Sequence, residues 1–335
     1  MLQTTQPSLL DILSRVPSGR PDTARLVWPV FVYESEEALI RHSKEASHSD
    51  AGSLNVSGRV SASRLAPIFE KLTLSGLEHL VLYGVPNERM EHPQLLLDRE
   101  SFLLRSVGEI KSRVPHLSVG LDLCVCQYVP SGHCRIGSDG SFLEQRTIEI
   151  LLEHAALGIE SGADFLMPSG MISDLLVPLK NLIRQYSHRQ IAVLSQSAKF
   201  VSPLYGPFQQ LAHAGSGIAD KRAYQLPEGD SVVALQRIKS ELDQGVDVAF
   251  VKPALSYLSL LTTAASQHLG KVGAFLTSGE SLLFNQVAQK RRVSPALVRD
   301  EAFLKLFGSK AALIVSHQAL EYAETISAEP RRLSV

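Results

Sequence analysis

Short apolar runs rich in β-branched residues alternate along this chain with longer segments of helical period. Runs of this kind, bounded by polar or turn residues, are typical of buried strands. Strands are therefore predicted at Leu26–Val32, His79–Val85, Leu117–Val125, Asp164–Pro168, Gln190–Ser197, Val246–Val251, Val272–Thr277 and Ala311–Val315.

The segments between these strands repeat their apolar residues every three or four positions, as amphipathic helices do. Such patterns predict helices at Ser63–Leu77, Thr147–Ser161, Ser231–Gln244 and Leu258–His268. A strand followed by a helix, eight times over, is typical of an α/β fold of the (β/α)8 TIM-barrel type. A doubly wound open sheet would give the same alternation. The first strand is not followed by a glycine-rich phosphate loop, which favours the barrel.

The length of 335 residues and the 44% hydrophobic content suit one large barrel. We expect a single catalytic domain over residues 26–330, with residues 1–25 left as an N-terminal oligomerisation arm. The irregular stretch around residues 203–230 is longer than most connections, and such segments are usually lids or binding loops.

Charge and cysteine content narrow the function further. The 33 basic and 34 acidic residues give a net charge of −1, which argues against nucleic-acid and anionic-membrane partners. No run reaches the roughly 18 apolar residues that a membrane span needs. Three cysteines form no closed disulfide framework and suit a reducing cytoplasm. Asp11 and Asp22 argue against a transit peptide at the N-terminus.

Two lysines stand at the ends of neighbouring predicted strands, where barrel enzymes gather their chemistry. Lys199 lies between Ala198 and Phe200, and Lys252 lies between two apolar residues of its own strand end. Both side chains could simply extend to solvent at the barrel rim. If they share an apolar pocket instead, each ammonium destabilises the other, and one becomes a neutral amine able to form a Schiff base with a ketone.

The three cysteines lie close together, as Cys124, Cys126 and Cys134. If the fourth strand continues through Val125, alternation places Cys124 and Cys126 on the same face, and the following loop can return Cys134 to them. Three thiolates bind Zn²⁺ and leave a fourth position open. Three buried cysteines without metal, or a closed structural site completed by His133, remain the alternatives.

These motifs together resemble porphobilinogen synthase, the δ-aminolevulinic acid dehydratase family. The resemblance rests on Asp122–Cys134, Ser195–Phe208, Asp220–Pro227, Val251–Leu258 and Ser278–Glu280, in that order along almost the whole chain. It implies a TIM barrel whose N-terminal arm builds a homo-octamer. It also implies a cytoplasmic enzyme that condenses two molecules of 5-aminolevulinate into porphobilinogen for tetrapyrrole (haem) synthesis.

The resemblance assigns roles to residues. Lys252 would form the Schiff base with the first substrate, and Lys199 would hold or activate the second. The three cysteines match the zinc-binding form of the family, and some members also use Mg²⁺ at a subunit interface, a site that we do not place. The substrate-binding positions would be Asp122, Tyr205, Phe208, Gln209, Lys221, Gln225, Ser278 and His317.

The chain departs from the family where carboxylates are bound. Gln209 and Lys221 occupy the positions of two arginines, His317 occupies that of a tyrosine, and Gly170 that of an aspartate. Neither glutamine nor lysine reproduces the bidentate guanidinium fork. Three hypotheses follow: a divergent but working synthase, a paralogue that condenses another amino-ketone through an imine, or a weakly active or non-catalytic subunit that regulates a true synthase.

Overall fold

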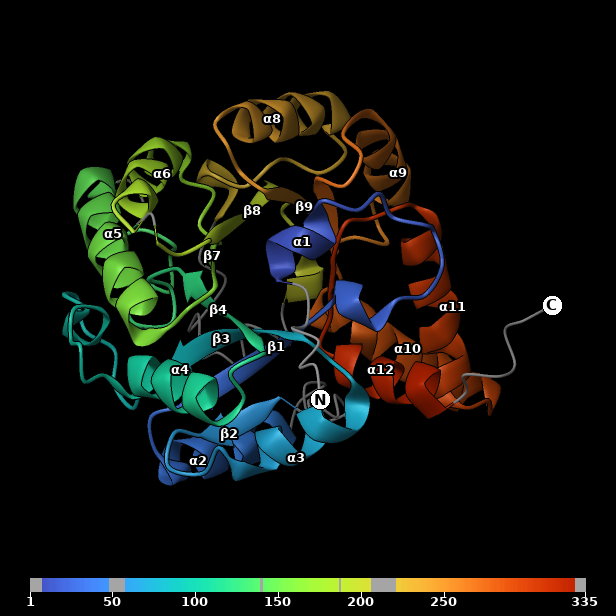
Figure 1. Ribbon diagram of the computed structural model, residues 1–335, viewed down its shortest axis with the longest axis horizontal. Helices are drawn as coiled ribbons and strands as arrows, with labels where there is room; N and C mark the ends of the chain where they lie inside the picture. The colour runs from blue at the N-terminus through green and yellow to red at the C-terminus, as the bar shows by residue number, and fades with distance from the viewer. Residues whose placement is uncertain (1–7, 48–57, 139–140, 187, 206–220, 329–335) are drawn as a thin grey trace.

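The computed structural model describes residues 8–47, 58–138, 141–186, 188–205 and 221–328 of the chain. A ring of helices surrounds a sheet of parallel strands (Figure 1). The strands are β1 Leu26–Tyr33, β2 Arg59–Ser61, β3 His79–Val85, β4 Ser118–Leu123, β7 Phe165–Pro168, β8 Ala192–Lys199, β9 Val248–Lys252, β10 Val272–Phe275 and β11 Ile314–Val315, with a hairpin of β5 Gly137–Ser138 and β6 Ser141–Phe142.

The helices follow the strands in the order expected for a barrel. They are α1 Leu9–Leu13, α2 Glu36–Ser47, α3 Ala66–Ser75, α4 Phe102–Arg113, α5 Glu144–Ser161, α6 Leu176–Arg184, α8 Ser231–Asp243, α9 Leu258–Gln267, α10 Ser278–Arg291, α11 Pro295–Gly308 and α12 Ala319–Ala328. Within the described ranges, no helix is long and apolar enough to cross a membrane.

The sheet closes on itself, because β11 pairs in parallel with β1 through Leu26↔Ile314 and Val27↔Val315. The neighbour order β11-β10-β9-β8-β7-β4-β3-β1 completes the ring, and β2 continues along the free part of β1. The (β/α)8 TIM barrel predicted from the alternation is therefore confirmed, and the open doubly wound sheet is wrong.

Alternate residues of each strand divide the apolar core into two parts, as the pleat requires. One cluster fills the barrel interior and includes Phe31, Phe165, Phe250 and Phe275. The other lies between the strands and the surrounding helices. Gly120 shows how tightly the interior is filled, because a Cβ there would lie 1.9 Å from the Phe165 ring.

The short helix α1 covers the N-terminal end of the barrel (Figure 1). Its capping box joins Ser8 and Asp11, and its buried Leu9 packs into the interior cluster. The Arg25 guanidinium fixes the chain between α1 and β1, donating to the carbonyls of Ala312 at 2.9 Å and Arg15 at 3.0 Å. The described part of the segment predicted as an oligomerisation arm thus packs on its own barrel.

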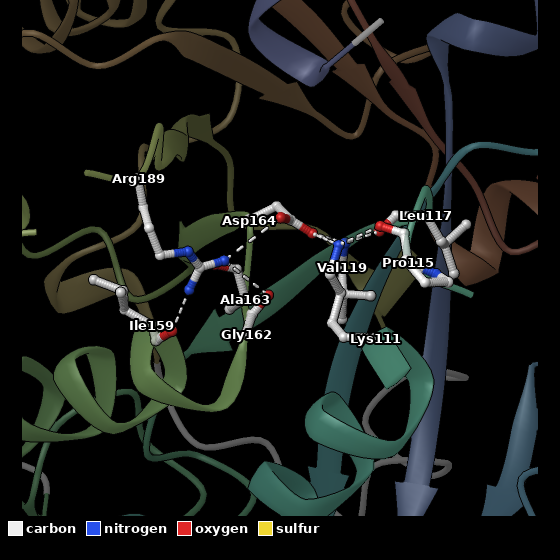
Figure 2. A network of polar contacts seen from close by, with 9 residues as sticks. All are labelled: Lys111, Pro115, Leu117, Val119, Ile159, Gly162, Ala163, Asp164 and Arg189. Atoms are coloured by element: carbon white, nitrogen blue, oxygen red, sulfur yellow. Dashed lines mark hydrogen bonds and ion pairs between the residues drawn. The ribbon is translucent and has the colours of Figure 1, made fainter. Parts of the chain in front are cut away.

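An acidic residue just before β7 fastens this same end of the barrel (Figure 2). Asp164 Oδ2 accepts the Val119 N–H at 2.9 Å and the Lys111 ammonium at 2.8 Å, and Arg189 lies 3.6 Å from Oδ1. Asp247, before β9, repeats the arrangement with the Val193 N–H at 2.8 Å. These contacts hold neighbouring strands together at the N-terminal face of the barrel. In TIM barrels that face contributes stability, and the active site lies at the opposite, C-terminal face.

Replacing Asp164 with alanine tests this role. The change removes the acceptor of a strand N–H and the partner of a half-buried lysine, so we expect the free energy of unfolding to fall by about 1–3 kcal/mol in urea titrations. The control is Asp243→Ala, which breaks the exposed Lys239–Asp243 ion pair and should cost less than about 1 kcal/mol. Equal losses in the two variants would contradict the assigned role.

Candidate active site

A pocket opens at the C-terminal ends of the barrel strands, and it gathers most of the residues singled out in the sequence. Its lining combines amines, three thiols, one carboxylate and several hydroxyl and amide groups. The lining residues are Tyr83, Asp122, Cys124, Cys126, Gln127, Cys134, Ser169, Gln196, Lys199, Tyr205, Lys221, Gln225 and Lys252.

The two strand-end lysines are cross-strand neighbours, because β8 and β9 pair Lys199 with Lys252 in parallel register. Lys252 follows the inward-facing Val248 and Phe250 by strict alternation. Lys199 reaches the same pocket only after a β-bulge between Ser195 and Ala198 shifts its strand by one residue. Its ammonium then donates to the Ser169 carbonyl at 2.8 Å.

Lys252 is buried among aromatic rings at the base of the pocket. Its Nζ lies 3.5 Å from the centroid of the Phe275 ring and 5.5 Å from that of Tyr205. Burial, followed by the positive charge of Lys199, holds the pKa of Lys252 well below its usual value. The two amines are therefore in the arrangement that the sequence suggested for a Schiff-base lysine.

The three cysteine thiols converge, with their sulfur atoms within 4.8 Å of one another. The geometric reason expected from the sequence is wrong, because β4 ends at Leu123 and the cysteines lie in the loop beyond it. A turn in that loop, closed by the Tyr128 N–H donating to the Val125 carbonyl at 2.9 Å, brings Cys126 beside Cys124. His133 does not belong to the cluster.

The thiol cluster has the chemistry of a site for a soft metal ion. Three buried sulfur donors within this range suit a metal that accepts thiolate ligands. Hydrogen bonds from Cys124 and Cys126 hold the pKa of Cys134 well below its usual value. Burial disfavours the charge of Lys221, yet the cysteine thiolates, Cys134 first, raise the pKa of that lysine.

Asp122 links the cysteine loop to Ser169, whose carbonyl accepts from Lys199, through a buried chain of hydrogen bonds. Ser169 Oγ donates to its Oδ1, and Gln127 Nε2 donates to its Oδ2 at 3.4 Å. Cys126 Sγ donates to Gln127 Oε1 at 3.3 Å, while Gln196 Nε2 donates to Ser169 Oγ at 3.0 Å. Burial raises the pKa of Asp122 to about 6, against the opposing effects of Ser169 and Lys199.

Ser278 and His317 are buried but do not line this pocket. The His317 ring stacks on Phe31, with centroids 5.7 Å apart, and burial together with the charge of Lys252 lowers its pKa to about 3. Ser278 begins α10, and its Oγ has no hydrogen-bond partner within the described part of the chain. Glu280 fixes this corner, because its Oε1 accepts the Leu255 N–H at 2.8 Å.

Tyr224 joins the cysteine loop to the segment that leads into α8. Its hydroxyl accepts the Cys134 N–H at 3.1 Å and lies 3.2 Å from His133 Nδ1. The Arg135 guanidinium lies over its ring at 4.1 Å. Two residues later, the Leu226 N–H donates to the Lys199 carbonyl at 3.0 Å. This segment therefore touches both the cysteine loop and the strand that carries Lys199.

The sequence predicted no role for Tyr224. Its position within the Asp220–Pro227 motif was the only available signal. Four further residues line the pocket although no role was predicted for them individually. They are Tyr83, Gln127, Ser169 and Gln196, and all four lie within the quoted motifs or at predicted strand ends.

Some of the remaining residues singled out in the sequence lie within the described ranges, and others do not. Phe208, Gln209 and much of the predicted lid lie outside the described residues. Tyr205 lines the pocket and donates its hydroxyl proton to the Phe200 carbonyl at 2.7 Å. Gly170 sits against the cysteine loop, since a Cβ there would lie 3.3 Å from Cys134 Cβ, and its carbonyl accepts from Arg135 at 3.2 Å.

Comparisons with known proteins show which family the chain is similar to. The family model described as delta-aminolevulinic acid dehydratase matches residues 14–325. Proteins named delta-aminolevulinic acid dehydratase from Bacillus subtilis and Methanothermus sociabilis are 25% and 28% identical to the chain. The first alignment covers 93% of this chain and 94% of the relative, and the second covers 90% and 91%.

A solved structure shares the fold. It is delta-aminolevulinic acid dehydratase (porphobilinogen synthase) from Toxoplasma gondii in complex with the reaction product porphobilinogen. The TM-score is 0.82 at 20% identity, over 93% of this chain and 87% of the other. With the family model matched over nearly the whole chain, the protein described here belongs to the delta-aminolevulinic acid dehydratase family.

Proposed function

We propose that this chain is a porphobilinogen synthase, which condenses two molecules of 5-aminolevulinate into porphobilinogen with the loss of two waters. The observation that carries the proposal is the pairing of Lys199 and Lys252 in one pocket with the three-thiol cluster. Forming a pyrrole from two amino-ketones requires one new carbon–carbon bond and one new carbon–nitrogen bond. Each bond forms at a ketone carbon, and an imine activates such a carbon.

Lys252 is assigned as the catalytic lysine for the first substrate. Its lowered pKa leaves a population of neutral amine whose lone pair attacks the ketone carbon. The resulting carbinolamine loses water to give an imine. The aromatic rings of Phe275 and Tyr205 beside Nζ keep bulk water away from that imine.

Lys199 and Asp122 are assigned to the second substrate. Lys199 projects beside Lys252, so a ketone held there is next to the first substrate, and this proximity supplies part of the rate acceleration. Asp122, with a pKa of about 6, can accept a proton near neutral pH and return it. Its hydrogen bonds to Ser169 and Gln127 hold the carboxyl group in place for that transfer.

The proposal includes a zinc ion held by Cys124, Cys126 and Cys134, since three thiolates are ligands that Zn²⁺ prefers. Bound there, zinc would act as a Lewis acid toward the second substrate. We further propose a cytoplasmic homo-octamer, supported by the family resemblance, with magnesium as an additional activator. Light scattering of the purified chain measures the oligomeric state.

Carboxylate recognition is the part of the site that differs from the family. Ser278 Oγ, which lacks a described hydrogen-bond partner, is proposed to donate to the first substrate's carboxylate. His317, with a pKa of about 3, is neutral and would add one N–H rather than a charge. For the second carboxylate, Lys221 and Gln225 are pocket residues that can donate. The family resemblance alone supports a place for Phe208 in the pocket lining and for Gln209 beside the second carboxylate.

Incubating the purified protein with 5-aminolevulinate tests the activity directly. We expect a pyrrole that an aldehyde colour reagent detects, and we expect a zinc chelator to abolish it and added Zn²⁺ to restore it. A zinc-loaded protein that forms no pyrrole at millimolar substrate would contradict the proposal. It would leave the paralogue or the regulatory subunit as the interpretation.

Borohydride reduction tests the assignment of Lys252. Reduction traps an imine as a stable adduct, and mass spectrometry of peptides should locate that adduct on Lys252. Lys252→Arg is expected to abolish both the adduct and turnover, with kcat falling by at least about 10³-fold, because arginine remains protonated. The control is Lys180→Arg, at a half-buried lysine of α6 that pairs with Asp247 and does not line the pocket. This variant should keep both the adduct and turnover.

Stability as a function of pH tests the lowered pKa. Between the folded pKa of Lys252 and the ordinary 10.5, the unfolded chain binds more protons, so the parent protein gains stability as pH rises. Lys252→Met removes the buried amine and should stabilise the protein by about 1–4 kcal/mol at pH 7. The advantage should shrink as pH approaches 10.5, and urea titrations over this range that show a constant difference would contradict the shift.

A further inference from the structure

The bulge in β8 decides on which side of the barrel wall Lys199 lies. Leu194 pairs with Val248 and Ser195 with Ala249, but the next pairs are Ala198↔Val251 and Lys199↔Lys252. Strand β8 therefore advances three residues while β9 advances two. One extra residue is inserted, which is the definition of a β-bulge.

Without this insertion, Lys199 would face away from the pocket. Leu194 belongs to the interior cluster, so strict alternation would send residue 198 inward and residue 199 outward. Instead, Ala198 packs in the outer cluster between the strands and the helices, and Lys199 lines the pocket. The position of one of the two amines thus depends on a local irregularity in the strand.

A single buried carboxylate accepts hydrogen bonds from two residues of β8, one just before the bulge and one within it. Glu241 of α8 accepts, at Oε2, the hydroxyl protons of Ser195 at 2.6 Å and Ser197 at 2.5 Å. Ser195 is the last residue in regular register, and Ser197 lies within the inserted stretch. All three residues are buried, so these charge-assisted bonds form without competition from water.

The same carboxylate is tied to the loop that receives the Lys199 ammonium. Arg237, one turn earlier on α8, forms an ion pair with Glu241 Oε1 at 3.0 Å. Its Nη2 donates to the Met171 carbonyl at 3.1 Å. Two residues before Met171, the Ser169 carbonyl accepts from Lys199. The network thus fixes both the strand that carries Lys199 and the loop to which its ammonium donates.

We propose that Glu241 is a positioning residue, which holds the β8 bulge through Ser197 and thereby turns Lys199 into the pocket. Glu241 lies on the outer side of the barrel wall and does not line the pocket, so it acts through Lys199 rather than on substrate. The catalytic consequence rests on the proposed function, whereas the placement of Lys199 does not.

Two serine variants form a matched test, because both serines are buried and donate to the same oxygen at nearly the same distance. Ser197→Ala removes the bond to the bulge, and Ser195→Ala removes the bond to the regular strand. In crystals of Ser197→Ala, the Lys199 ammonium should no longer reach the Ser169 carbonyl, whereas in Ser195→Ala this hydrogen bond should persist. A Ser197→Ala structure that retains both the hydrogen bond and the bulge overturns the proposal.

Kinetics supply the second readout. In Ser197→Ala we expect kcat for pyrrole formation to fall about tenfold or more, while borohydride still traps a 4-oxo acid at Lys252, because burial, the larger cause of its lowered pKa, remains. Ser195→Ala should have the same melting temperature as Ser197→Ala but keep the kcat of the parent protein. Equal kcat losses in the two variants would count against a role specific to the bulge.

Variants of Glu241 itself complete the set. Glu241→Gln keeps one oxygen that can accept from both serines and should retain the bulge, whereas Glu241→Leu should abolish it. If the parent protein forms no pyrrole, the proposed function fails, and the crystal structures still decide the placement of Lys199. If pyrrole forms but the bulge persists in Ser197→Ala, only the positioning role fails.

Discussion

Two lysine amines held side by side in one pocket are the constraint on which the rest of this site depends. Placing Lys252 among aromatic rings and beside Lys199 disfavours its charge, and only the packed barrel can impose that cost. Closure of the sheet through β1 and β11 makes this possible, because it fixes the register of every strand around the ring. The nucleophile is thus a product of the fold as much as of the residue.

The two ends of the barrel divide stability from chemistry. At the N-terminal end, α1 covers the interior and Asp164 binds a strand N–H and a lysine (Figure 2). These contacts use charge to hold strands in place. At the C-terminal end, charged and polar groups are buried and their pKa values are shifted, as the raised pKa of Asp122 shows. Shifted pKa values of this kind are typical of a site that moves protons.

Three positions at which the sequence analysis predicts a departure from the family pattern make specific contacts in this fold. Gly170 leaves room for the cysteine loop, which approaches so closely that a side chain there would press on Cys134. Lys221 lies with the thiol cluster, whose negative charge favours its protonated form. His317 is neutral and stacked on Phe31. Of these three positions, only Lys221 carries a positive charge, because glycine has no side chain and His317 is neutral.

The sequence by itself determined the barrel, the eight strands, the two strand-end lysines and the three cysteines, because hydrophobic period and residue type are local properties. Tertiary structure alone decided how these residues meet. The cysteines converge through a loop rather than along a strand, Tyr224 reaches the Cys134 N–H from a distant segment, and Lys199 faces inward because of a bulge. Register, loop closure and bulges depend on contacts between residues far apart in the chain, such as Ser197 and Glu241, which no local pattern encodes.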